Sequence, residues 1–443
     1  MNLEDLSART IPSQLKFSEI TPLGMSCRSK KVKFFPQSGG IFTPNNNIVR
    51  INVSSSTQFL DPQFTVLRFQ YKNTSNKTMV FDNSAHAVIQ QLRTISTSGH
   101  ELENIDKYAR LYTSLADALL DTSARLTLAG QGYGYHGILR TAQVVANPVV
   151  AVANDGVSEK TLGTSELTLT TGASATFFLP LLSSVIGYSQ KKYLPLFLCG
   201  QITLELAFAS AYRPYTIEAN PTGTYEISNV ELHTQLIEFD SSVNESLTAM
   251  TRKNGLFLHG TSWSSHFNPF VNGTGTIVIS ERLKSLKSIL TSFSLPSADV
   301  TKRSMARHHG SVTGLQFKIG SEHYPNQPIV GVASSSTDNS EYIYELQKAL
   351  GVYNNINHSS MINTVNFASD DDTPALCARP LFGIDLDGFS GNQIESGVNT
   401  ILNTPINVNI TCSASTPGLV NYTHLLYDVI YNITPDGQFL MSK

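Results

Sequence analysis

Charged residues and cysteines are both scarce in this chain of 443 residues. Only 15% of the residues are Asp, Glu, Lys or Arg, and the formal net charge is -3. A protein whose main task is to neutralise a long phosphate backbone carries a clear excess of Lys and Arg, so this balance argues against that class. Cys27, Cys199, Cys377 and Cys412 are too widely spaced for a CxxC metal site and too few for a disulfide framework. We expect reduced or buried thiols.

Long apolar segments are also absent. No run reaches the roughly 18 apolar residues that cross a bilayer, and the first 17 residues contain acidic side chains and no apolar stretch typical of a signal peptide. We therefore expect a soluble protein that is made in the cytosol.

Short alternating segments bounded by turn residues are what the sequence does contain. Residues 31–35, 48–53, 65–73, 201–209 and 225–239 are rich in β-branched and aromatic residues, and Gly, Pro, Asn or Ser separate many of them. Apolar residues recur at spacings of three and four only over 101–121 and 340–353, which predicts one helix in each half of the chain.

The second half repeats the order of the first. Residues 255–260, 276–281 and 286–295 correspond to the first three predicted strands, and a helix and further strands follow in both halves. Near the end of each half, the pairs Phe178/Phe382, Gly187/Gly391 and Ile202/Ile406 all differ by 204 positions (382 - 178, 391 - 187 and 406 - 202). This regularity indicates a duplicated unit.

An all-β fold of two tandem eight-stranded antiparallel jelly rolls, each with a short helix in a loop, accounts for this pattern. Two sheets packed face to face, with eight strands and their loops, need about 200 residues. We predict an N-terminal arm (1–30), a first jelly roll (31–240), a linker (241–254) and a second jelly roll (255–443). A pair of immunoglobulin-like sandwiches is the alternative, but each needs only about 100 residues and the helices would have no place.

The motifs that suggest chemistry are all weak. The G-x-G-x-x-G string at 132–137, with Asp155 beyond it, leads into a Pro-broken segment instead of opening a helix, so a loop is the better interpretation. His308 and His309 with His323 lack a carboxylate at ligand spacing, and a surface loop is favoured over a metal site.

Two acidic stretches are candidate calcium sites. Asp385 and Asp387 begin like an EF-hand loop, but Phe389 stands where an oxygen ligand is needed. The acidic run 370–372 is best explained as a solvated loop. The sequence has no G-x-S-x-G, H-E-x-x-H or G-x-x-x-x-G-K-[ST] motif, so no catalytic, cofactor-binding or metal-binding residue is assigned.

A basic cluster precedes the first clear strand. Arg28, Lys30, Lys31 and Lys33 lie close together, and they either form a solvated terminal arm or face nucleic acid or an anionic membrane.

Five segments in order resemble a known family. Residues 30–44, 56–62, 92–112, 317–329 and 382–400 are similar to major capsid proteins of the double jelly-roll, PRD1-adenovirus lineage, nearest to those of polinton-like and adintovirus-type eukaryotic DNA viruses. The resemblance implies a homotrimer that forms a pseudo-hexagonal capsomer, lateral capsomer contacts in an icosahedral shell around a DNA genome, and neighbouring minor capsid or penton proteins. It implies a place in the virion and no catalytic residues.

Under that resemblance, further expectations follow. The insertion from Asp121 to Thr176 would be an outward tower or an intersubunit loop, and the basic arm would lie on the inner face. Two other classes share the strands: a tandem β-sandwich for carbohydrate binding or adhesion, against which the single tryptophan, Trp263, counts mildly, and a β-sandwich hydrolase with converging acids.

Overall fold

The computed structural model describes most of the chain and leaves out several connections. The described residues are 26–81, 84–121, 168–209, 215–217, 223–270, 274–294, 307–332, 338–353, 362–368, 379–388, 396–402, 404–413 and 418–443, with single positions between them. The predicted sites at 132–137, Asp155, 370–372 and Phe389 lie outside these ranges, as do Cys377, Gly391 and most of the insertion.

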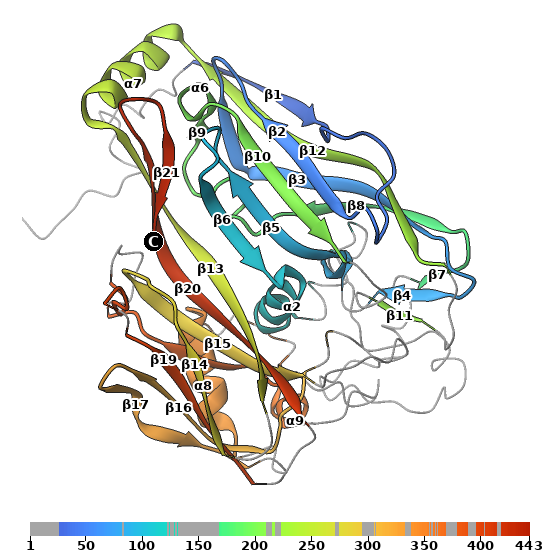
Figure 1. Cartoon of the computed structure of the whole chain (residues 1–443), viewed down its shortest axis with the longest axis vertical. Coiled ribbons are helices and arrows are strands. Elements are labelled where there is room, and N and C mark those ends of the chain that lie inside the picture. Colours follow the sequence, from blue (N-terminus) through green and yellow to red (C-terminus); the bar gives the residue numbers. More distant parts are fainter. Residues whose placement is uncertain are drawn as a thin grey trace, which may run out of the picture.

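The first half of the chain folds into a sandwich of two antiparallel sheets with four main strands each, and the short strand β9 (Leu194–Pro195) adds a fifth strand to one of them (Figure 1). Its strands are β1 (Cys27–Phe34), β2 (Ile48–Val53), β3 (Phe59–Asn73), β5 (Ile89–Ile95), β6 (Glu101–Asp106), β8 (Ser174–Pro180), β10 (Ile202–Phe208) and β12 (Tyr225–Phe239). One sheet, called sheet 1a here, has the order β1-β12-β3-β8, and the facing sheet 1b has the order β2-β10-β5-β6.

The second half contains the same arrangement. Its strands are β13 (Leu256–Phe270), β14 (Gly275–Ile279), β15 (Leu286–Ser294), β16 (Val312–Ile319), β17 (Glu322–Val330), β18 (Phe382–Asp385), β19 (Ile406–Cys412) and β20 (Leu419–Ile433). Sheet 2a has the order β13-β20-β15-β18 and sheet 2b the order β14-β19-β16-β17. Each strand of one half therefore has a counterpart in the other, which confirms the predicted double jelly roll.

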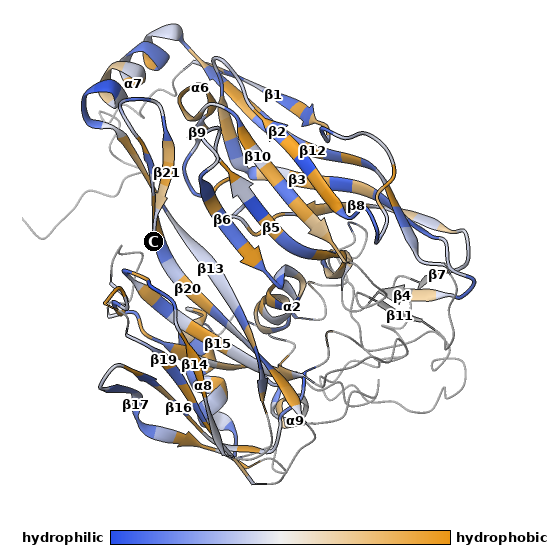
Figure 2. Ribbon diagram, in the orientation of Figure 1, coloured by the Kyte–Doolittle hydropathy of each residue, from blue (hydrophilic) through white to orange (hydrophobic). Residues whose placement is uncertain are grey.

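Alternating side chains build the core of each sandwich. On β2, Val49, Ile51 and Val53 are fully buried while Ile48 and Arg50 point outward, and the alternation of hydropathy is visible along the strands in Figure 2. Aromatic rings fill the space between the sheets: Phe69 contacts Phe177 in the first core, as Phe293 contacts Phe382 in the second.

The predicted register between the halves is right at one pair and wrong at another. Ile202 and Ile406 both begin their strands and are fully buried. Phe178, however, is 38% exposed, and Phe177 takes the core position that corresponds to Phe382. A shift of one residue moves a strand side chain to the opposite face, so a pattern match alone could not assign this pair.

The helices differ from the prediction at residues 101–106 and in the expected linker, 241–254. Within the described residues they are η2 (Ala85–Val88), a short 3-10 helix, and α2 (Tyr108–Leu119), α6 (Leu196–Cys199), α7 (Ser241–Asn254), α8 (Ser340–Ala349) and α9 (Thr364–Phe367). The predicted helix at 101–121 is wrong in its first third, because 101–106 pairs with β5 as strand β6, and pairing between distant strands overrides the helical spacing. α8 agrees with the prediction. The residues expected to be a linker, 241–254, form α7.

Long connections gather at one end of the molecule. The two longest, 107–173 and 331–381, both leave the end opposite α7 (Figure 1). A small sheet of β11 (Tyr215–Ile217), β4 (Met79–Phe81) and β7 (Thr168–Leu169) also lies there. At the α7 end, β9 (Leu194–Pro195) pairs with β3, and β21 (Phe439–Ser442) pairs with β20. Within the described part of the chain, no helix has the length and apolar character needed to cross a bilayer.

Candidate assembly surfaces

A buried carboxylate joins the two jelly rolls. Glu103, on β6 of the first jelly roll, is 1% exposed. Its Oε1 accepts hydrogen bonds from the backbone N–H and hydroxyl of Ser184 at 2.9 and 2.7 Å, and from the hydroxyl of Ser262 on β13 at 2.8 Å. Its Oε2 accepts a hydrogen bond from Ser183, and the Ser184 hydroxyl also bonds that of Tyr431 on β20. Both halves of the chain therefore supply donors around one side chain.

Burial and hydrogen bonding act in opposite directions on this group. Desolvation raises the pKa of Glu103, and the hydrogen bonds from Ser183, Ser184 and Ser262 lower it in part. Burial also raises the pKa of Tyr431 well above its usual value, so its hydroxyl stays neutral. The stability of this cluster thus depends on the hydrogen bonds that surround the buried carboxyl group of Glu103.

A second buried cluster lies on α2. Asp117 is 2% exposed, and its Oδ2 is 2.7 Å from the guanidinium of Arg307, which comes from the second half of the chain. The Nε of Arg379 lies 3.9 Å from Oδ1. The backbone carbonyl of Asp117 also accepts a hydrogen bond from the hydroxyl of Ser360 at 3.0 Å. The helix of the first jelly roll is thereby bound by residues of the second.

Cationic side chains extend this contact toward sheet 2a. The guanidinium of Arg110 lies 4.0 Å from the ring centre of Tyr422 on β20, and the ammonium of Lys107 lies 4.4 Å from that of Phe267 on β13. Such cation–π contacts are attractive where water is partly excluded. They place α2 and the residue before it over the outer face of sheet 2a.

Two histidines are buried as neutral rings. Burial lowers the pKa of His86, on η2, to about 3, although its hydrogen bond to the Pro180 carbonyl at 3.0 Å opposes the shift. Burial also lowers the pKa of His424, on β20, to about 3, and nearby Arg110 and His266 add to the effect. His424 bonds Ser265 through Nδ1 at 2.8 Å.

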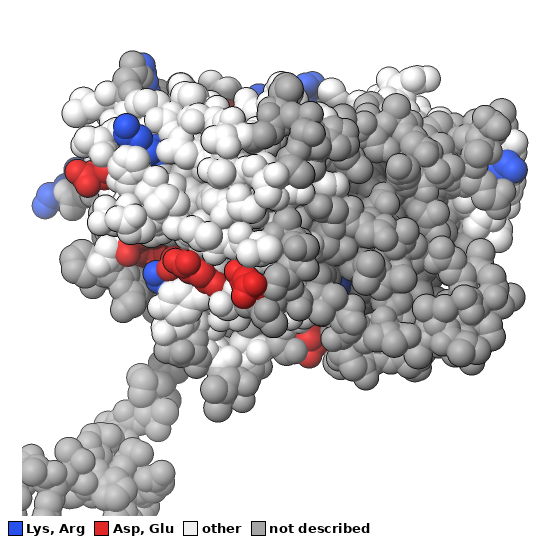
Figure 3. Space-filling view, turned by 90° about the horizontal axis from the view of Figure 1, so that it is seen from below, with Lys and Arg blue, Asp and Glu red and all other residues white. Residues whose placement is uncertain are grey.

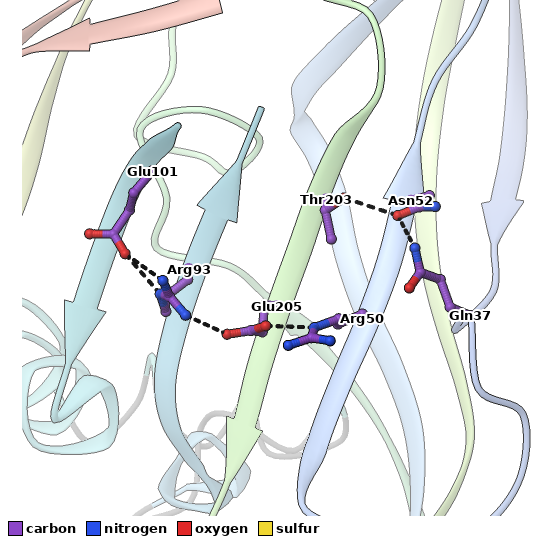
Figure 4. Close-up of polar contacts among 7 residues, drawn as sticks. All are labelled: Gln37, Arg50, Asn52, Arg93, Glu101, Thr203 and Glu205. Carbon is purple, nitrogen blue, oxygen red and sulfur yellow. Dashed lines mark hydrogen bonds and ion pairs between the residues drawn. The ribbon is translucent and has the colours of Figure 1, made fainter. Parts of the chain in front are cut away.

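The outer face of sheet 1b carries a ladder of ion pairs. Glu205 on β10 lies between Arg50 on β2 and Arg93 on β5, at 2.7 Å from each, and Arg93 also pairs with Glu101 on β6 at 2.8 Å (Figure 4). Next to it, Thr203 donates to Asn52 at 3.0 Å. These charges neutralise one another across four strands.

The equivalent positions of sheet 2b carry no such ladder. On β14, β19 and β16, the residues paired in the same way are Thr276, Asn409 and Gln316, with a hydrogen bond of 2.9 Å between the first two. Two equivalent surfaces therefore have different chemistry, and an uncharged surface costs less to desolvate than paired ions.

The predicted basic cluster forms an exposed edge strand. Arg28, Lys30, Lys31 and Lys33 lie on β1, at the edge of sheet 1a, and all four are exposed. Lys33 pairs with Glu231 on β12 at 3.1 Å. Lysines on an edge strand oppose unwanted pairing with other strands. Arg28, the first of these residues, lies opposite Glu238 on β12 and therefore near α7, which begins at Ser241.

The structure does not bring the three histidines of the candidate metal site together. His308 bonds the backbone N–H of Gly310 through Nδ1 at 2.9 Å, His309 packs against Phe367 and Phe382, and His323 lies on β17. Among the described residues, no group of His, Cys, Asp and Glu has metal-binding geometry.

The residues of the joint were not predicted from the sequence. Asp117 offered a signal, because it interrupts an otherwise apolar and small-residue run on α2. Glu103 offered no such signal, because its segment has the spacing of an amphipathic helix, on which a glutamate is expected to face solvent.

Replacing Glu103 tests the first cluster. Glu103→Ala removes the acceptor of four buried donors, and we expect it to lower the free energy of unfolding by about 2–4 kcal/mol in urea titrations. The control is Glu101→Ala on the exposed ladder, expected to cost less than about 1 kcal/mol. Equal effects of the two variants would contradict the role of Glu103.

Replacing Asp117 tests the second cluster. Asp117→Asn leaves Arg307 and Arg379 buried without their carboxylate, and we expect a loss of about 3–5 kcal/mol, measured by thermal or chemical unfolding. Glu226→Gln removes an ion pair with Lys72 that is 3.8 Å long and partly exposed, and should cost less than about 1 kcal/mol. A loss for Asp117→Asn as small as this control would refute the argument.

The buried histidines predict acid sensitivity. A histidine with a pKa of about 3 when folded and 6.5 when unfolded contributes full stability above pH 6.5 and loses it as the pH falls toward 3. At pH 5 the stability lost relative to pH 6.5 amounts to about 2 kcal/mol for each ring. The slope of unfolding free energy against pH should be shallower in His424→Gln, whereas exposed His259→Gln should keep the wild-type slope.

Comparison with known proteins identifies the fold. No family model matches the sequence, and no curated protein does. Solved structures do match. A chain from the 3.5 Å cryo-EM structure of the Sputnik virophage has a TM-score of 0.60 at 11% identity, covering 98% of this chain and 92% of that one. The Faustovirus major capsid protein has a TM-score of 0.56 at 9% identity, covering 100% and 94%.

A third match comes from another virophage. The mavirus major capsid protein has a TM-score of 0.51 at 10% identity, covering 98% of this chain and 95% of that one. The similarity extends over nearly the full length in all three cases, while identity is too low to transfer residues. The chain therefore has the double jelly-roll fold of viral major capsid proteins.

Proposed function

We propose that this protein is a major capsid protein that forms pseudo-hexameric homotrimers and assembles them into an icosahedral virus shell around a DNA genome. The observation that carries the proposal is the duplication: two jelly rolls of the same strand order are joined by buried contacts within one chain. Three such chains supply six similar units, which suits a hexagonal outline.

The two ends of the molecule support a direction in the shell. The arm enters beside α7, where Cys27 pairs with Phe239, and the longest connections leave the opposite end. Figure 3 views the molecule from below, and most of the described side chains visible there are neither acidic nor basic, apart from a group of acidic residues near the centre. We place the arm inside, with Arg28, Lys30, Lys31 and Lys33 available to genome or membrane, and the insertion from Asp121 to Thr176 outside or between subunits.

The remaining parts of the proposal follow from the role. The subunit would be made in the host cytosol, act in the virion, contact minor capsid or penton proteins, and have no catalytic activity. The four predicted segments, 1–30, 31–240, 241–254 and 255–443, would serve as arm, first jelly roll, connector and second jelly roll.

A carbohydrate-binding or adhesive sandwich is the less favoured function. Trp263, the tryptophan weighed for sugar stacking, is 7% exposed. Its ring is therefore covered, and an aromatic platform for a sugar needs an accessible face.

Light scattering on the purified native protein tests the proposal. We expect a stable species of three times 48.4 kDa, and negative-stain images of the same fraction should show hexagonal particles or closed shells. A protein that remains monomeric over a wide range of concentration and salt would contradict it.

A further inference from the structure

The helices α2 and α8 occupy equivalent places in the two jelly rolls. α2 follows β6 and precedes β8, and α8 follows β17 and precedes β18, the counterparts of those strands. Each helix packs on its own half, but α2 contacts η2 and β5 of sheet 1b, whereas α8 contacts β18 and β15 of sheet 2a. The two helices are therefore equivalent in chain order and not in the strands that they contact. The duplication of the chain therefore includes these helices.

The two helices differ in how far the side that faces away from their own jelly roll is buried. Ten of the twelve residues of α2 are buried, because the second jelly roll covers the side that carries Asp117. Only four of the ten residues of α8 are buried. Tyr344 on α8 and Tyr353 just after it are 41% and 44% exposed, with ring centres 4.9 Å apart. α8 thus presents two neighbouring aromatic rings to solvent.

The surface that covers α2 also has a counterpart. Arg110 and Lys107 contact Tyr422 on β20 and Phe267 on β13, which belong to sheet 2a. The strands equivalent to β13 and β20 are β1 and β12 of sheet 1a. β1 is an exposed edge strand, and Phe178 on β8 exposes 38% of its surface on the outer face of the same sheet.

We propose that α8 of one copy docks on the edge of sheet 1a, at β1 and β12, in the first jelly roll of a second copy. The inference rests on the proposed function, since it assumes self-association, and it specifies the contact. The contact repeats between copies the relation that α2 and sheet 2a have within one chain. Because the two surfaces differ, each copy offers one of each, and such head-to-tail contacts form a ring when the rotation between successive copies closes.

The charges of the two surfaces are complementary. Asp338 and Glu341 are exposed at the start of α8. Arg28, Lys30 and Lys31 are exposed on β1, and in this contact they would face a second copy in place of the genome or membrane named above. Acidic and basic surfaces attract during encounter, and the exposed ring of Tyr353 can accept a lysine or arginine cation, whereas the ring centre of Tyr344 already lies 5.4 Å from the ammonium of Lys348. Cation–π contacts of this kind already join α2 to sheet 2a within the chain, but there the cations belong to the helix and the residue before it, and the rings belong to the strands.

Hydrogen exchange on the unmodified protein gives the first test. Amides of 340–353 and 27–34 should exchange more slowly in the assembled species than in monomer released by dilution, whereas α7 should be unchanged. Equal exchange of α8 in the two species would overturn the inference and leave the proposed function standing. Failure of the wild-type protein to self-associate would overturn both.

Substitutions give the second test. Tyr344→Ala with Tyr353→Ala should weaken association by at least about tenfold, measured by light scattering against concentration. The matched control is Met250→Ala, a residue of α7 that is 46% exposed and should leave association unchanged. Circular dichroism should show the wild-type fold in each variant. Wild-type association of the tyrosine variant would refute the contact.

Charge reversal keeps the test decisive if the tyrosine variant misfolds. Lys30→Glu with Lys31→Glu makes both surfaces acidic and should weaken association. Adding Asp338→Lys and Glu341→Lys in the same chain restores opposite charges and should recover it. Loss without recovery, in variants that keep the wild-type fold, would count against the pairing of these two surfaces.

Discussion

Buried polar groups at the joint between the jelly rolls are the constraint on which the arrangement of the two halves depends. A carboxylate such as Glu103 can be removed from water only if donors surround it, and here β6, the segment after β8, and β13 all contribute to its environment. The ion pair of Asp117 with Arg307 imposes a similar condition on α2. Apolar contacts alone tolerate sliding, whereas these bonds are lost when the halves shift by a few ångströms.

Duplication gives the chain two sandwiches of one design with different surfaces. The cores are equivalent, with Phe69 and Phe177 in one and Phe293 and Phe382 in the other. The outer faces are not: Arg50, Glu205 and Arg93 are replaced by uncharged residues on sheet 2b. In the proposed ring of six units from three chains, the two halves would have different neighbours, so identical surfaces would not serve both.

Strand order and the helix α8 could be predicted because they depend on local patterns. Residues 48–53 and 225–239 alternate with period two and coincide with β2 and β12. The error at 101–106 has the opposite cause. Those residues have helical spacing, but their place beside β5 is decided by pairing with a distant strand. The single-residue error at Phe178 has another cause. A match of residue types between the two halves can be off by one position, and one position decides which face of the strand a side chain occupies.

The sequence by itself determined the class of fold, its duplication and the basic character of β1, because alternation, turn residues and charge are properties of neighbouring positions. Only the tertiary structure decided which polar residues join the halves. Ser262 is 159 positions from Glu103, and Arg307 is 190 positions from Asp117. Contacts over such separations follow from how complete sandwiches pack, and the burial that makes them strong exists only after both have folded.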